Sequence, residues 1–332
     1  MEEQVIQTIT KYHLIQSGDK LVLAVSGGPD SLFMLDILNK LKQKLNFEIV
    51  ACHVNHMIRE EAEDDEKFVK EFCKEIEVEC YTKRIDVAQY ARNFKIGTEE
   101  AGRIIRYEFF EEVLKKTNSD KIAVAHNKND KVETIIMNLL RGTGVLGLKG
   151  IEPIRDKKFI RPIIECERTQ IEKYCQDKNL NPRIDKTNFE NIYTRNKIRN
   201  VIIPYIQKEF NPNIVEGISR LSEIATEEDE YLNQITAQKY NEILIENSKS
   251  QITLDLKLFN KENKVIKRRL VLYTITSLMG TATSIEKVHI EDIIKLCGNN
   301  IGNKYLTPNK NIKVLVKKGK IFFERQTQDS VK

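Results

Sequence analysis

The chain has 332 residues, 40% of them hydrophobic, which is too long for one typical domain and enough to form two folded cores. No apolar run approaches the roughly 18 residues of a membrane-spanning helix, and the acidic, amphipathic N-terminus is unlike a signal peptide, so we expect a cytoplasmic protein. The six cysteines never form a CxxC pair, so the sequence signals neither a zinc nor an iron–sulfur site.

Positive charge is distributed unevenly along the chain. The net charge is +5, yet residues 254–325 contain 15 Lys and Arg against 6 Asp and Glu, which gives +9 there and leaves −4 for the rest. A basic excess of this size suits a polyanion such as nucleic acid, although a solvated lysine-rich face also explains it.

The N-terminal part alternates apolar, β-branched runs with helix-like segments. Strands are predicted at 21–25, 48–54, 79–85 and 121–126, and helices at 31–45, 60–77, 99–116 and 130–141. This alternation predicts a Rossmann-like α/β fold with a parallel sheet covered on both faces. Ligands of such sheets bind at the C-terminal ends of the strands, so the loops after Val25, His53 and Ala125 should share one rim.

The alternation stops after Asn211 and Pro212. Residues 214–246 predict a long polar helix or helix pair, and the pattern from Ile252 onward predicts a small α+β domain. We therefore expect an N-terminal α/β domain over 1–212, a helical connector over 213–250 and a basic α+β domain over 251–332.

The first predicted strand leads into a glycine turn and a helix start. The turn comprises Ser26, Gly27, Gly28, Pro29, Asp30 and Ser31. Adjacent glycines let the backbone approach a ligand closely, and the N-terminus of a helix favours an anion such as phosphate. Such a corner is also often a plain connection, so turn chemistry alone leaves both interpretations open.

The run SGGPDS resembles SGGxDS, the pyrophosphate loop of the N-type ATP pyrophosphatases. That resemblance implies that residues 26–31 bind ATP and that the enzyme cleaves it between the α- and β-phosphates. His53 and His126, which end two strands at the same rim, are assigned to the same ATP site. A pair of satisfied structural histidines is the alternative for His53 and His56.

Later segments resemble the tRNA(Ile)-lysidine synthetases, in order and densely over residues 18–215. The matching segments are HVNHMIREEAEDDEKFV (53–69), GTEEAGRIIRYEFF (97–110), the stretch from AVAHNKND to GLKGI (123–151), FIRPIIE (159–165), DKTN (185–188) and YTRNKIRNVIIP (193–204). The later stretches depart from the family pattern at Gly102, where alanine is usual, and at Lys131, where glutamine is usual.

The same segments supply candidates for adenylation chemistry. Asp130 and Glu133 lie one turn apart on a predicted helix, a spacing that suits Mg²⁺ held together with ATP phosphates. Arg106 and Arg195 would stabilise the leaving pyrophosphate. The resemblance also implies a catalytic role for Asp36 in the first predicted helix; an ordinary helix aspartate is the alternative.

The resemblance implies a complete reaction. ATP activates the wobble cytidine of the CAU anticodon of tRNA(Ile) as an adenylate, free L-lysine attacks C2 and expels AMP, and the product is lysidine. Contacts to tRNA are expected from Arg199 and from the dense cluster Lys267, Arg268 and Arg269. The sequence leaves a homodimer open, and it leaves open whether the chain is naturally short or lacks a further C-terminal domain.

Three rival functions would share parts of this pattern. A tRNA thiolase belongs to the same ATP-binding superfamily, but its iron–sulfur form needs paired cysteines. A GMP or NAD synthetase would explain SGGPDS and leave the later motifs unexplained. A non-catalytic tRNA-binding relative is the rival from another class, and retention of Asp36, Asp130 and Glu133 speaks against it.

Overall fold

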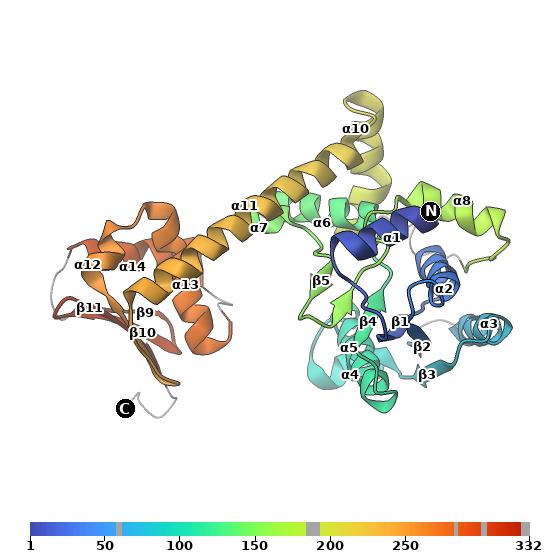
Figure 1. The fold of residues 1–332 in the computed structure, drawn as a ribbon, viewed down its shortest axis with the longest axis horizontal. Coiled ribbons are helices and arrows are strands. Elements are labelled where there is room, and N and C mark those ends of the chain that lie inside the picture. Colours follow the sequence, from blue (N-terminus) through green and yellow to red (C-terminus); the bar gives the residue numbers. More distant parts are fainter. Residues whose placement is uncertain (58–61, 184–192, 282–284, 300–303, 327–332) are drawn as a thin grey trace. The chain divides into compact units, whose positions relative to one another are not determined.

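A computed structural model describes residues 1–57, 62–183, 193–281, 285–299 and 304–326 (Figure 1). The matching segment 185–188 therefore lies outside the described residues, as do residues 58–61 of the segment 53–69. The chain forms two compact units, unit 1 from Met1 to Ala225 and unit 2 from Thr226 to Lys332.

Unit 1 contains a six-stranded sheet in the order β3-β2-β1-β4-β6-β5. All neighbouring strands are parallel except β5, which runs antiparallel to β6 at the edge. The strands are β1 (Lys20–Ala24), β2 (Glu48–Asn55), β3 (Cys80–Arg84), β4 (Lys121–Val124), β5 (Ile154–Arg155) and β6 (Phe159–Ile160). The predicted Rossmann-like α/β fold is thus confirmed.

Helices pack against both faces of this sheet. The helices that begin in unit 1 are α1 (Glu2–Lys11), α2 (Pro29–Leu41), α3 (Ala62–Glu75), α4 (Val87–Phe94), α5 (Thr98–Lys116), α6 (Lys128–Leu140), α7 (Val145–Leu148), α8 (Arg168–Asp177), α9 (Thr194–Lys197), the π-helix Ile198–Ile202, α10 (Ile203–Glu209) and α11 (Ile214–Ile243). In β1, Leu21 and Leu23 pack with residues of α2, whereas Val22 packs with Phe109 and Phe110 of α5. Successive side chains of a strand point to opposite faces, so a strand covered on both sides is apolar throughout.

Unit 2 is a small α+β structure, as predicted. Its antiparallel sheet has the order β7-β8-β11-β10-β9. Three helices contribute to one hydrophobic core with the sheet, which also takes in the part of α11 that belongs to unit 2. The elements are β7 (Leu244–Asn247), β8 (Gln251–Asp255), α12 (Leu256–Lys261), α13 (Lys264–Met279), α14 (Lys287–Asn299), β9 (Tyr305–Asn309), β10 (Ile312–Lys317) and β11 (Lys320–Arg325).

No helix in the described part of the chain combines the length and apolar character needed to cross a bilayer.

Gly150, at the end of the glycine series that follows α6, has a conformation and surroundings that exclude a side chain. Its φ is +65°, and a Cβ there would lie 2.8 Å from Cγ1 of Ile135 and 3.1 Å from the carbonyl oxygen of Lys131. We expect Gly150→Ala to lower the free energy of unfolding of unit 1 by about 2–4 kcal/mol, from left-handed strain and overpacking together.

Gly142 provides the matched control for this prediction. Its φ is +80°, but among the described residues nothing lies within 4 Å of a Cβ built there. Gly142→Ala should therefore cost only the backbone strain, about 1–2 kcal/mol. Urea unfolding followed by circular dichroism measures both variants, and equal losses of stability would contradict the packing argument.

Candidate active site

The loop between β1 and α2 is organised by one serine hydroxyl. Oγ of Ser31 accepts hydrogen bonds from the backbone N–H groups of Ser26 and Gly27, both at 3.1 Å, and donates to the carbonyl oxygen of Gly28 at 2.9 Å. Gly27 adopts φ +90°, which a glycine tolerates best. The N-cap of α2 is Gly28, so no side chain caps the positive end of this helix. This arrangement leaves a turn and a helix N-terminus suited to phosphate.

His53 supports the same rim from the end of β2. Its side chain is buried, and Nδ1 lies 2.9 Å from the carbonyl oxygen of Val25, to which a protonated Nδ1 donates. Burial lowers the pKa of His53, so the ring is neutral near pH 7. The histidine therefore ties the end of β2 to the residue that precedes the loop.

The loop is joined directly to the start of α6. Asn127 caps this helix by accepting a hydrogen bond from the backbone N–H of Asp130, and the side chain of Asp130 accepts one from the N–H of Asn127. The amide of Asn127 also donates to Oδ1 of Asp30 at 2.8 Å. The capping box and this hydrogen bond hold Asp130 and Asp30, in the first turns of α6 and α2, at the same edge of the sheet.

Three arginines converge on the carboxylates of Asp130 and Glu133, and we call these five residues the carboxylate–arginine cluster. Arg199 makes the shortest contact, from Nε to Oε1 of Glu133 at 2.6 Å, and its Nη2 lies 3.0 Å from Oδ1 of Asp130. Arg195 contacts the same two carboxylates at 2.9 and 3.2 Å. Arg168 contacts both at 3.5 Å. The cluster joins α6 to α8, α9 and the π-helix.

His126 and Arg161 form a hydrogen-bonded pair outside the carboxylate–arginine cluster. Nε of Arg161 donates to Nδ1 of His126 at 3.2 Å, and burial together with Arg161 and Arg195 lowers the pKa of His126 to about 3. His126 is therefore a neutral hydrogen-bond acceptor at neutral pH. Arg106 contributes to the same lowering and so lies near His126, although its Nε donates to Gly102 in its own helix.

Other predicted residues lie apart from the carboxylate–arginine cluster. Oδ2 of Asp36 accepts hydrogen bonds from Nζ of Lys40 at 2.6 Å and from the hydroxyl of Tyr174 at 2.7 Å, an arrangement that links α2 to α8. In unit 2, each member of the basic triplet contacts its own unit. Lys267 donates to the carbonyl oxygen of Asn260, Arg268 pairs with Glu291, and Arg269 pairs with Asp229.

The carboxylates of Asp130 and Glu133 suit Mg²⁺ only when phosphate oxygens supply further ligands. Among the described residues there is no group of three or more His, Cys, Asp or Glu side chains placed to hold a metal ion. Mg²⁺ is commonly held by one or two carboxylates plus substrate phosphates and water, and Asp130 and Glu133 provide such a pair. In this structure the arginines of the cluster neutralise both carboxylates.

Asp30 carries the most informative pKa shift in the site. Burial and the charge of Asp130 raise its pKa to about 6 from the ordinary 3.8. Because the folded chain binds this proton more tightly than the unfolded chain, the stability that Asp30 contributes is full below about pH 4 and is lost as the pH rises through 6. This difference corresponds to about 3 kcal/mol, since one pH unit is worth about 1.4 kcal/mol.

Asp30→Asn should therefore stabilise unit 1 in a pH-dependent way. We expect its thermal unfolding midpoint to exceed that of the parent at pH 8 and to equal it below pH 4, because asparagine does not ionise. Circular dichroism melts at the two pH values provide the measurement. An equal gain at both would mean that ionisation of Asp30 is not its source.

Comparison with known proteins identifies the family. Residues 1–206 match the PP-loop domain family. The chain is 46% identical to the tRNA(Ile)-lysidine synthase of Clostridium acetobutylicum, covering 93% of this chain and 67% of that protein. It is 42% identical to the same enzyme of Caldanaerobacter subterraneus, covering 100% of this chain and 71% of the relative. The chain belongs to the tRNA(Ile)-lysidine synthase family.

The family predicted from the motifs is thus confirmed. A third lysidine synthase, from Clostridioides difficile, is 43% identical and matches 98% of this chain and 70% of its own length. Among solved structures, the U34-tRNA thiolase of Methanococcus maripaludis superposes with a TM-score of 0.54 at 20% identity, covering 67% of this chain and 78% of the thiolase. At that identity, the superposition shows a shared fold only.

Arg168 is the member of the cluster that sequence reasoning missed. It follows the segment 159–165, but nothing in the sequence distinguished it from an exposed arginine at the start of a helix. Arg195 and Arg199 could be anticipated because their spacing of four places them on one helix face.

Proposed function

We propose that this chain ligates lysine to C2 of the wobble cytidine in the CAU anticodon of tRNA(Ile), using ATP and forming lysidine. The modification changes the codon that the tRNA reads from AUG to AUA. The proposal rests chiefly on one observation: lysidine synthases are 42–43% identical to this chain over nearly its whole length.

In the first step, O2 of the cytidine attacks the α-phosphorus of ATP. A new P–O bond forms, the bond between the α-phosphorus and the bridging oxygen breaks, and pyrophosphate leaves. The loop of residues 26–31 and the start of α2 would hold the phosphates. Arg168, Arg195 and Arg199 supply three positive charges where the leaving group gains negative charge.

In the second step, the amino group of lysine attacks C2 and AMP leaves with the former O2 oxygen. The attacking amine releases one proton to solvent as the C–N bond forms.

Asp130 and Glu133 would hold Mg²⁺ together with phosphate oxygens, and the ion would neutralise phosphate charge during adenylation. Both carboxylates are engaged by guanidinium groups in this structure. Phosphate oxygens compete for the same guanidinium groups, so arriving ATP would free carboxylate oxygens for the cation. Before the nucleotide binds, the two carboxylates thus compensate two of the three guanidinium charges.

Binding of tRNA is supported by the uneven charge of the chain. The +9 carried by residues 254–325 lies in unit 2, where the hairpin of β10 and β11 has exposed lysines at 317 and 320 and, in the turn between them, at 318. Backbone phosphates are neutralised by such lysines, and the resulting affinity falls as salt is added. Lys267 and Arg268 remain proposed members of this surface.

A reconstituted reaction tests the proposal. The full chain is incubated with ATP, Mg²⁺, L-lysine and a tRNA(Ile) transcript with a CAU anticodon, and the nucleosides are analysed by mass spectrometry. We expect a cytidine whose mass is increased by one lysine less one water, and no such product when lysine is omitted. Binding of the transcript without pyrophosphate release would instead favour a non-catalytic tRNA-binding protein.

A further inference from the structure

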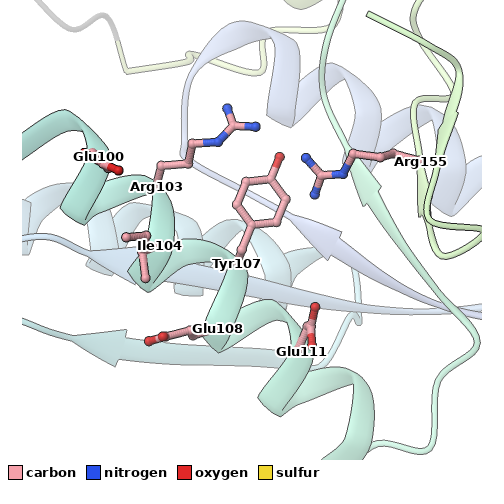
Figure 2. Close-up of a pocket in the computed structure, with 7 residues that line it drawn as sticks. All are labelled: Glu100, Arg103, Ile104, Tyr107, Glu108, Glu111 and Arg155. Carbon is pink, nitrogen blue, oxygen red and sulfur yellow. The ribbon is translucent and has the colours of Figure 1, made fainter. Parts of the chain in front are cut away.

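A groove of about 480 Å³ lies on the surface of unit 1 between α5 and β5. Arg103 and Tyr107 of α5 and Arg155 of β5 line it, together with Ile104 and the glutamates Glu100, Glu108 and Glu111 of α5 (Figure 2). Its volume is in the range of small-ligand sites, about 300–1,000 Å³, and the predicted chemistry of the active site uses none of these side chains.

The two arginines of the groove are held against one aromatic ring. Cζ of Arg103 lies 5.1 Å from the ring centroid of Tyr107, and Cζ of Arg155 lies 4.5 Å from it. Arg155 also lies 4.4 Å from the centroid of the buried Phe159. Figure 2 shows the two guanidinium groups flanking Tyr107, with the tyrosine hydroxyl between them. Cation–π contacts thus fix two like charges near one hydroxyl.

Arg155 pairs with Asp156, whereas Arg103 has no ion-pair partner among the described residues. Glu111 pairs with Lys158 at 2.6 Å, and Figure 2 places it toward the end of Tyr107 opposite the hydroxyl. Nε of Arg155 is 3.3 Å from a carboxylate oxygen of Asp156, but it is buried and makes no hydrogen bond. Arg103 is exposed and Arg155 is partly exposed, so two guanidinium groups that converge beside one hydroxyl form an arrangement that an oxyanion would complete.

The groove adjoins the active-site rim. Arg161 donates from Nε to His126 and from its backbone N–H to the carbonyl oxygen of Pro153, which directly precedes β5, the strand that carries Arg155. Burial, and after it the charges of Arg155 and Arg103, lower the pKa of Arg161. Positive side chains therefore continue from the carboxylate–arginine cluster, past His126, to the groove.

We propose that Arg103, Tyr107 and Arg155 form a clamp for a backbone phosphate of the RNA, next to the nucleotide whose base enters the active site. This inference rests on the proposed function and names a contact that positions its RNA substrate. The guanidinium groups flank the tyrosine ring, which favours recognition of the sugar–phosphate backbone over stacking of a base. The phosphates of ATP already have the loop of residues 26–31 and the cluster arginines.

Arg103→Ala tests the clamp with little risk to folding, because Arg103 is exposed and its described contact is with the ring of Tyr107. We expect the Kd for the tRNA(Ile) transcript to rise about tenfold at moderate salt, the effect of losing one charged hydrogen bond. The slope of log Kd against log salt should fall by about 0.7, the value of one single-strand phosphate contact. KM for ATP should stay within twofold of the parent value.

Lys116→Ala is the matched control, since Lys116 also belongs to α5 and lies 4.8 Å from the ring centroid of another tyrosine, Tyr81. It should bind tRNA as the parent does. An Arg103→Ala variant that binds tRNA like this control would overturn the clamp, as would a raised KM for ATP with unchanged tRNA affinity. Failure of the parent chain to form lysidine would instead count against the proposed function.

Discussion

Glu133→Gln is expected to destabilise unit 1 by about 3–5 kcal/mol and to lower lysidine formation at least about 100-fold. Glu133 is 1% exposed and receives charged hydrogen bonds from Arg195 and Arg199, with Arg168 at 3.5 Å. Glutamine keeps the shape but removes the charge, which leaves three guanidinium groups facing Asp130 alone. Removing one partner of a buried ion pair is costly because the remaining charges lose their compensation.

Hydrogen exchange read by mass spectrometry localises this effect. Peptides from α6 and β4 should lose protection in the variant, whereas peptides from unit 2 should not. Glu112→Gln is the control, because Glu112 pairs with Lys83 on the surface and its side chain is 58% exposed. Such a pair contributes about 0–1 kcal/mol. Parent-like exchange in α6 together with full activity would contradict the role given to Glu133.

The parts of the fold and site that follow local rules could be predicted from the sequence. The four predicted strands correspond to β1, β2, β3 and β4. Buried parallel strands are largely apolar, which explains β1, β2 and β4. The edge strand β3 is only partly buried and includes Lys83 and Arg84. The loop of residues 26–31 could be located because its glycines and the helix start are contiguous in the chain. Asp130 and Glu133 could be paired because helix geometry alone places them on one face.

Contacts that depend on tertiary packing could not be predicted in the same way. The place of Asp36 beside Tyr174 depends on how α8 packs against α2, a contact between segments 138 residues apart. Arg168 joins the cluster because the chain turns at the start of α8, where its backbone N–H donates to Asn129. No periodicity within either segment carries this information.

The basic triplet of α13 is another case in which the contacts made in the fold could not be predicted from the charge pattern of the sequence. Lys267, Arg268 and Arg269 form the densest basic cluster, which indicates an RNA surface. In the structure, however, Nη2 of Arg269 lies 2.7 Å from Oδ1 of Asp229, a carboxylate with 1% of its side chain exposed, and Nη1 donates to Asn233. Arg269 therefore joins α13 to α11 within unit 2.

Arg269→Glu should consequently unfold unit 2 rather than report on RNA binding. The substitution places a second carboxylate beside the buried Asp229, so the cost should exceed the about 3–5 kcal/mol of a simply broken buried pair. We expect loss of amide protection in β8, β10 and β11, with protection in unit 1 unchanged. The double variant Asp229→Asn with Arg269→Gln removes both charges and should recover most of the lost protection.

RNA binding by this surface is better tested with Lys267→Gln and Arg268→Gln, each with Arg269 retained. Arg268 pairs with Glu291, and its side chain is 36% exposed, so its replacement should cost at most about 1 kcal/mol of stability. If both side chains contact phosphates, each variant should lower the salt slope of tRNA binding by about 0.7–0.9. Unchanged slopes with intact amide protection in unit 2 would remove the triplet from the RNA surface and leave Arg269 with its structural role.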